Sequence, residues 1–104
     1  MDLRLTESAD GKSVNLRVGQ QFTIVLQENP TTGFRWQFVE NGKPVVQLDR
    51  DFFKASSRQL GAGGLHEWLF HAASSGQVTI TMKLARAWNQ NASARSFSVR
   101  LRVT

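Results

Sequence analysis

The sequence predicts an all-β fold, an immunoglobulin-like antiparallel β-sandwich of seven to eight strands. Apolar and polar residues alternate with a period of two over most of the 104 residues, as in strands with one buried face. Turn signals rich in Gly, Asn, Asp, Ser or Pro separate these runs about every eight to twelve residues. No window repeats every 3.6 residues over three turns, so helices are not expected. We predict one domain over 1–104, with a small closed barrel as the alternative architecture.

The first half of the chain contains the less regular strands. Alternation predicts strands within 3–5, 14–18, 22–27, 34–39 and 45–49. The run 14–18 is read with Val14, Leu16 and Val18 on its apolar face. The segment 51–54, with adjacent phenylalanines, fits either a short strand or a single helical turn.

The second half contains three longer runs, at 65–71, 78–85 and 97–103. In the first of them Trp68 and Phe70 share one face with His66. The other face is also apolar, so the pattern does not decide which face points inward. The last run has one apolar face and one wet face. Large residues at core positions identify the candidates for the centre of the core: Trp36, Phe22 and Phe97, with Trp68 beside them.

Composition excludes several classes of protein. The chain has no cysteine, so it has no disulfide and no thiolate metal site. Its net charge of +5 comes from 13 Lys plus Arg against 8 acidic residues, and the dispersed positive charge favours an acidic partner surface only weakly. No run reaches membrane-spanning length and none resembles a signal-peptide core. We expect a monomer outside the membrane; its compartment stays open, and a mature secreted or periplasmic form is consistent with the sequence.

Neither a catalytic nor a metal site is predicted. The only histidines, His66 and His71, lie five residues apart in one strand and therefore on opposite faces, and Glu67 adds one candidate ligand at most. No nucleophile elbow or comparable spacing singles out a catalytic set. We expect a protein that is not an enzyme and that needs no cofactor.

The connection between the runs 22–27 and 34–39 is the most distinctive stretch. Pro30 fixes its own φ and keeps Asn29 out of the helical region, while Gly33 permits a positive φ where the chain turns back. Thr31 and Thr32 add stiff side chains with hydroxyl groups. The stretch is either a well-formed connection or a preorganised binding loop.

Two further loops are predicted at the same end of the molecule. Connections alternate between the two ends of an antiparallel sandwich, so the loop at Asn29, the loop at Gly61 and the loop at Trp88 should emerge together. Trp88 follows the last apolar residue of its strand and precedes three polar amides, so we expect it to be exposed.

These three loops resemble one known family. Asn-Pro-Thr-Thr-Gly-Phe at 29–34, Gly-Ala-Gly-Gly at 61–64 and Arg-Ala-Trp at 86–88 are similar, in order and spacing, to the motifs of chagasin-type inhibitors of cysteine peptidases. The resemblance extends over about 16–103. The third motif usually reads Arg-Pro-Trp in the family, so Ala87 departs from it, and the loss of proline should loosen that loop.

The resemblance implies an immunoglobulin-like fold and tight, reversible, non-covalent inhibition of papain-like cysteine peptidases. It implies a central wedge over the catalytic Cys and His of the enzyme, made by Pro30, Thr31, Thr32, Gly33 and Phe34, with Asn29 beside them among the peptidase-binding residues. Phe34 would anchor the wedge, and Thr31 and Thr32 would hydrogen-bond to the enzyme. Extended backbone along one side of the cleft would come from Gly61, Ala62, Gly63, Gly64 and Leu65. Arg86 and Trp88 would grip the other side.

Two functions of other classes are weaker alternatives. A small basic β-domain can bind single-stranded nucleic acid, but here the aromatic residues lie mostly at core positions and do not alternate with Lys and Arg on one face. A carbohydrate-binding or adhesion module could use Trp88 as a platform for a sugar, on the support of one exposed indole. We therefore expect a peptidase, and neither nucleic acid nor glycan, as the partner.

Overall fold

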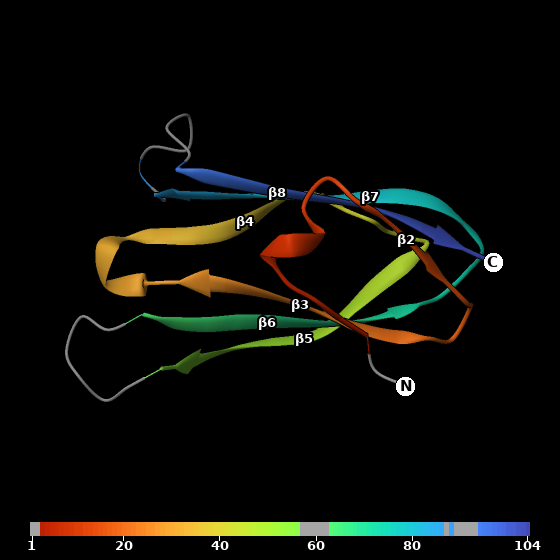
Figure 1. Cartoon of the computed structure of the whole chain (residues 1–104), viewed down its shortest axis with the longest axis horizontal. Coiled ribbons are helices and arrows are strands. Elements are labelled where there is room, and N and C mark those ends of the chain that lie inside the picture. The colour runs from red at the N-terminus through yellow and green to blue at the C-terminus, as the bar shows by residue number, and fades with distance from the viewer. Residues whose placement is uncertain (1–2, 57–62, 87, 89–93) are drawn as a thin grey trace.

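Two four-stranded sheets pack face to face in the computed structural model, which describes residues 3–56, 63–86, 88 and 94–104 (Figure 1). The first sheet has the order β1–β3–β6–β5 and the second has the order β2–β8–β7–β4. Their strands are β1 (Leu3–Leu5), β2 (Ser13–Leu16), β3 (Gln21–Glu28), β4 (Phe34–Asn41), β5 (Val46–Ala55), β6 (Gly64–Ala72), β7 (Gly76–Arg86) and β8 (Arg95–Val103). The predicted immunoglobulin-like sandwich is confirmed, and the closed barrel is not formed.

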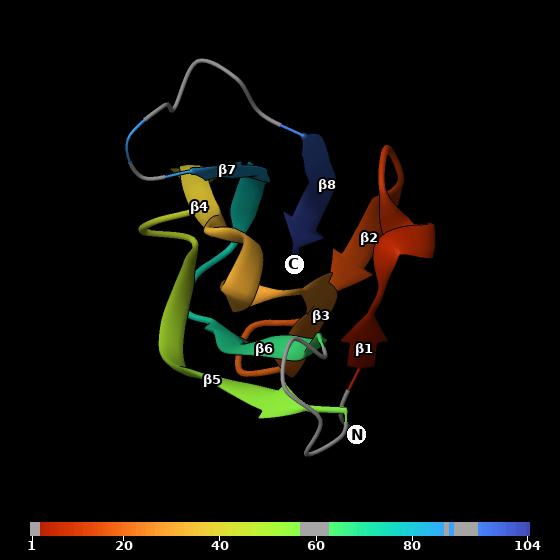
Figure 2. The ribbon, with the colours of Figure 1, turned by 90° about the vertical axis from the view of Figure 1, so that its left-hand side faces the viewer.

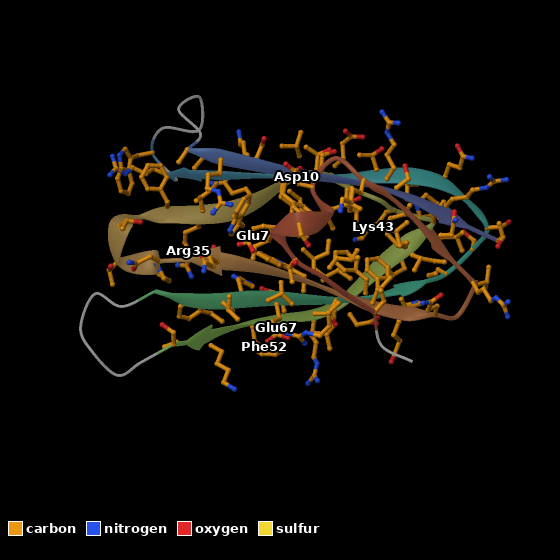
Figure 3. The ribbon with its side chains drawn as sticks, in the orientation of Figure 1. Glu7, Asp10, Arg35, Lys43, Phe52 and Glu67 are labelled. Atoms are coloured by element: carbon orange, nitrogen blue, oxygen red, sulfur yellow. The ribbon has the colours of Figure 1, made fainter. Side chains whose placement is uncertain are left out.

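The chain begins by contributing one short strand to each sheet. β1 pairs in parallel with β3, and β2 pairs in parallel with β8. The 3₁₀ turn η1 (Glu7–Ala9) links them along the side of the sandwich, where Glu7 and Asp10 are labelled in Figure 3. The Glu7 carboxylate accepts the amide of Gln27 in β3 (2.9 Å), and the Asp10 carboxylate accepts the amide of Ser98 in β8 (2.8 Å). The turn therefore satisfies edge amides of both sheets.

The core lies between the sheets and follows the predicted alternation. Phe22, Trp36 and Phe97 are all buried, which confirms them as core residues. Trp68 and Phe70 also point inward, so the structure decides the face of β6 that the sequence left open. Phe22 and Phe70 stack with ring centroids 5.0 Å apart, near the middle of the first sheet.

Two expectations about burial were wrong. Val18 lies beyond the end of β2 and is 53% exposed, because the chain leaves the strand after Leu16 to turn towards β3. Thr23 and Val25, on the outer face of β3, are also buried, although alternation over 22–27 is typical of a strand with one buried face. The reason is a bridge across β3: Arg4 of β1 pairs with Glu67 of β6 at 3.1 Å, and their side chains cover this part of the sheet.

The two segments predicted at 45–49 and 51–54 form one strand. β5 runs continuously along β6, with a register shift between Leu48 and Arg50 that accommodates the irregular apolar pattern. Phe53 then faces inward, while Phe52 lies opposite Glu67 on the outer face, where Figure 3 labels both. The ambiguous segment is therefore a strand and not a helical turn. No helix in the described ranges is long and apolar enough to cross a membrane.

Candidate functional site

Three strand junctions meet at one end of the sandwich. β3 leads to β4, β5 to β6 and β7 to β8 at the left-hand side of Figure 1, and Figure 2 looks directly onto this end. In Figure 2 the β3–β4 connection lies in the middle, between the ends of β7 and β8 above it and those of β5 and β6 below it. The convergence expected from strand order is therefore present in the described residues.

The β3–β4 connection is a capped 3₁₀ turn, η2 (Pro30–Thr32). Asn29 is its N-cap, and its side-chain oxygen accepts the amide of Thr31 (3.2 Å) and the hydroxyl of Thr31 (2.6 Å). Pro30 occupies the first position of the turn, where its missing N–H costs nothing. Gly33 closes the turn with φ +82°, a left-handed conformation that favours glycine.

The donors of this turn are used inside the turn itself. The Thr32 hydroxyl donates to the carbonyl of Asn29 (2.7 Å) and accepts the amide of Phe34 (3.3 Å). The amides of Thr32 and Gly33 donate to the carbonyls of Asn29 and Pro30, both at 3.1 Å. Thr31 and Thr32 are exposed, and because their hydroxyl hydrogens are used inside the turn, these two side chains offer hydroxyl lone pairs to a partner.

The third predicted loop is packed onto the first through Trp88. A Cβ placed on Gly33 would lie 2.6 Å from Cη2 of Trp88, so the indole rests directly on the glycine backbone. The Arg86 guanidinium lies 4.4 Å above the Phe34 ring and 5.7 Å from the Trp88 ring, and its Nε donates to the carbonyl of Thr32 (3.4 Å). Trp88 is nevertheless 74% exposed, which confirms the expected exposure. Arg86 braces its own end of the site, with Phe34 half-buried beneath it.

Gly63 and Gly64 approach the η2 turn from the side opposite Trp88. A Cβ on Gly63 would lie 3.3 Å from the carbonyl oxygen of Glu28 and 3.4 Å from Cβ of Asn29. Gly64 is the first residue of β6 and is buried, and a Cβ there would collide with the carbonyl of Lys54. Gly64 therefore permits close packing of β6 against β5. Gly61, Ala62 and Ala87 lie outside the described residues.

A groove of about 550 Å³ separates the η2 turn from the beginning of β6. Its apolar lining comes from Phe34, Leu65 and Leu84, and Gly63 also lines it. Leu65 is 39% exposed although it belongs to a strand. This end of the molecule thus combines acceptors on the turn, an exposed indole on one side and an apolar groove on the other.

Glu28 is the residue of this end that sequence reasoning missed. Its side chain is buried, and its Oε2 accepts the amide of Trp36 (2.8 Å), which joins the end of β3 to β4 across the two sheets. The Trp36 indole Nε1 donates to the carbonyl of Gln27 (2.8 Å) and makes a second link there. One signal was available: Glu28 continues the inward phase of Phe22, Ile24 and Leu26, which places an acid at a core position.

The histidines have carboxylate partners. His66 lies between Glu28 and Asp51, and His71 pairs with Asp49 at 2.8 Å. Among the described residues no group of three or more His, Asp or Glu side chains is arranged to hold a metal ion.

A shallow depression of about 600 Å³ lies on the outer face of the second sheet, and Arg100 and Arg102 line it beside polar residues. No aromatic ring contributes to that lining, so it offers no platform for stacked bases.

Comparison with known proteins agrees with this geometry. Residues 15–103 match the model of the chagasin family of peptidase inhibitors (family I42). Chagasin from Trypanosoma cruzi is 28% identical over 93 residues, which cover 85% of this chain and 84% of chagasin.

Two solved structures share the fold. The cysteine protease inhibitor EhICP2 from Entamoeba histolytica superposes with a TM-score of 0.86 at 22% identity, covering 99% of this chain and 95% of that chain. The inhibitor PbICP-C, solved in complex with falcipain-2, superposes with a TM-score of 0.67 at 16% identity, covering 99% of this chain and 98% of that chain.

The family match defines a protein inhibitor of peptidases rather than an enzyme. Because the family model covers most of its length, the chain belongs to the chagasin family of peptidase inhibitors. Its function is the inhibition of cysteine peptidases, with a cysteine peptidase as its partner.

Proposed function

We propose that this chain is a tight, reversible, competitive inhibitor of papain-like cysteine peptidases, and that the three-loop end is the inhibitory surface. The turn from Asn29 to Phe34 enters the catalytic cleft, the segment from Gly61 to Leu65 lies along one wall, and Arg86 and Trp88 contact the other. The inhibitor acts as a monomer, because all three loops come from one chain. The complex of PbICP-C with falcipain-2 supports a partner of this kind.

The observation that carries the proposal is the consumption of donors within the η2 turn. The hydroxyls of Thr31 and Thr32 donate inside the turn, so both threonines meet a partner as acceptors. The active site of a papain-like enzyme is rich in donors, since it contains an imidazolium and the N–H groups that stabilise an oxyanion. An acceptor-rich wedge complements that site.

The same turn explains why the inhibitor should survive uncut. A substrate is attacked when an extended strand holds its scissile carbonyl against the thiolate. Here the chain is folded into a 3₁₀ turn whose carbonyls at Asn29 and Pro30 accept internal hydrogen bonds. The turn therefore fills the cleft without presenting a carbonyl in attack geometry, and its stiffness limits the entropy lost on binding.

Inhibition of papain by the full chain tests the proposal. We expect competitive inhibition at nanomolar concentration, with weakening by about 2 kcal/mol or more in Thr31→Ala/Thr32→Ala and in Trp88→Ala. Val18→Ala is the matched control. Val18 is also an exposed apolar residue, but its amide donates to the carbonyl of Thr104 (3.1 Å), at the carboxyl terminus, which Figure 1 marks at the opposite end of the sandwich. Full papain activity at micromolar inhibitor would refute the function. Equal potency of all variants would refute the assigned surface.

A further inference from the structure

A continuous row of hydrogen bonds crosses the sandwich beneath the inhibitory turn. Asp51 Oδ2 lies 2.6 Å from His66 Nε2, His66 Nδ1 lies 2.8 Å from Glu28 Oε1, and Glu28 Oε2 accepts the Trp36 amide at 2.8 Å. These four residues, here called the Glu28 network, belong to β5, β6, β3 and β4 in turn. The network therefore joins four strands and both sheets.

The chemistry of His66 makes the network interdependent. Each nitrogen of the His66 ring faces a carboxylate oxygen, Nδ1 that of Glu28 and Nε2 that of Asp51. The ring is thus held at both nitrogens and cannot turn without breaking both contacts. The ring also stacks on Trp68, with centroids 3.9 Å apart and parallel planes. Removal of His66 leaves the Glu28 carboxylate without this partner in a buried position, because the Glu28 side chain is only 1% exposed.

The network is attached to the bases of two of the three loops. Glu28 immediately precedes Asn29, the N-cap of the turn, and Trp36 follows the turn on the opposite sheet. His66 follows Gly64 at the beginning of β6, and Asp51 lies on β5, the strand that leads into the second loop. These contacts therefore connect the base of the η2 turn to the strand that begins beside Gly63.

We propose that the Glu28 network is the positioning device of the inhibitory surface, which fixes the β3–β4 turn relative to the β5–β6 junction. Its members bind no peptidase directly; they act through the turn, and the inference rests on the proposed function of that turn. A second histidine–carboxylate pair in the same molecule provides a comparison. His71 and Asp49 form the same kind of pair on the same two strands, at the far end and with both side chains about 40% exposed.

The test compares His66→Gln and Glu28→Gln with His71→Gln in the full chain. Both network variants should inhibit papain at least about tenfold less strongly than wild type, and His71→Gln should match wild type. Ile80→Val controls for stability, because Ile80 is fully buried in β7 away from the network. It should lower the melting temperature and leave the inhibition constant unchanged. Amide exchange provides a direct readout: the Trp36 amide should exchange faster in the network variants alone.

Asp51→Asn tests the same point at the exposed member of the network, because Asp51 is 46% exposed and its substitution leaves the side chain of Glu28 in place. Amide chemical shifts of Thr31 and Thr32 should move in all network variants and stay unchanged in His71→Gln. Unchanged shifts and an unchanged Trp36 exchange rate in folded His66→Gln would overturn the proposal, as would shifted signals with unaltered inhibition. Wild-type protein that fails to inhibit papain would overturn the proposed function, while the exchange and shift data would still decide whether the network positions the turn.

Discussion

Substituting Gly33 by alanine separates two demands that the structure makes on one residue. The first is conformational: at φ +82° an alanine pays about 1–2 kcal/mol for the left-handed region. The second is steric, because the new Cβ would lie 2.6 Å from Cη2 of Trp88 and the indole must move. If the displaced indole is a binding hot spot, its loss weakens inhibition by about 2 kcal/mol or more, which is roughly 30-fold.

Gly11 provides the matched control for this experiment. It has φ +77°, and a Cβ on it would meet nothing within 4 Å. Gly11→Ala should therefore destabilise the protein by about the same 1–2 kcal/mol without changing inhibition. For a domain of this size, each kcal/mol lowers the melting temperature by about 4–8 °C. Gly33→Ala should show a similar thermal shift and, in addition, the loss of papain inhibition.

A third variant identifies the indole as the cause. In Trp88→Ala the space above Gly33 is empty, so adding Gly33→Ala to it should weaken inhibition little further. The reasoning fails if Gly33→Ala inhibits papain as strongly as Gly11→Ala, or if the effects of Gly33→Ala and Trp88→Ala on the inhibition constant are fully additive.

Four further substitutions test individual contacts. Thr31→Val keeps the shape but removes the hydroxyl and its bond to Asn29, so papain inhibition should weaken about tenfold and stability should fall by about 0.5–1.5 kcal/mol; Thr31→Ser should retain potency, and a loss there would contradict the role of the hydroxyl. Trp88→Ala should leave the melting temperature within a degree or two of wild type, because the indole is 74% exposed, and a cooperative loss of stability would instead make it a structural residue. Asn29→Ala removes the cap of the turn and should cost about 1 kcal/mol in urea unfolding, whereas Asn29→Asp, which preserves a side-chain acceptor, should cost less. Gly64→Ala should destabilise by about 1–3 kcal/mol through overpacking against the carbonyl of Lys54, and a neutral result would show that β5 can yield there.

Period-two alternation was sufficient to predict the strands and most of the core, because one buried face per strand imposes that pattern. It failed where burial came from side chains of distant elements. Thr23 and Val25 are covered by the Arg4–Glu67 pair, whose members are 63 positions apart and carry no local signal of their contact. Val18 fits the alternation of Val14 and Leu16 but lies past the end of β2 and is exposed. Alternation predicts which residues share a face of a strand, but it does not predict the residue at which strand pairing ends.

The candidate site was predictable in outline and not in its contacts. Strand order places the three loops at one end, and the capping residues of the turn can be read from Asn29, Pro30 and Gly33. The packing of Trp88 on Gly33 and the direction of the threonine hydroxyls depend on three-dimensional geometry that local sequence does not encode. Glu28 was overlooked because a charged residue at an inward-facing position is usually taken to mark the end of a strand. Its partners, Trp36 on β4 and His66 on β6, become known only from the structure.

The pairing of the last residues of β8 has a practical consequence for attaching the protein to other molecules. Val103 pairs with Gly76, the first residue of β7, while Arg86 at the other end of the same strand belongs to the three-loop end. At about 3.3 Å per residue the two ends of β7 are about 33 Å apart, and Figure 1 shows the carboxyl terminus on the side away from the loops. A reporter, a resin or a second domain tethered behind Thr104 would accordingly hold the molecule with its working end facing outwards.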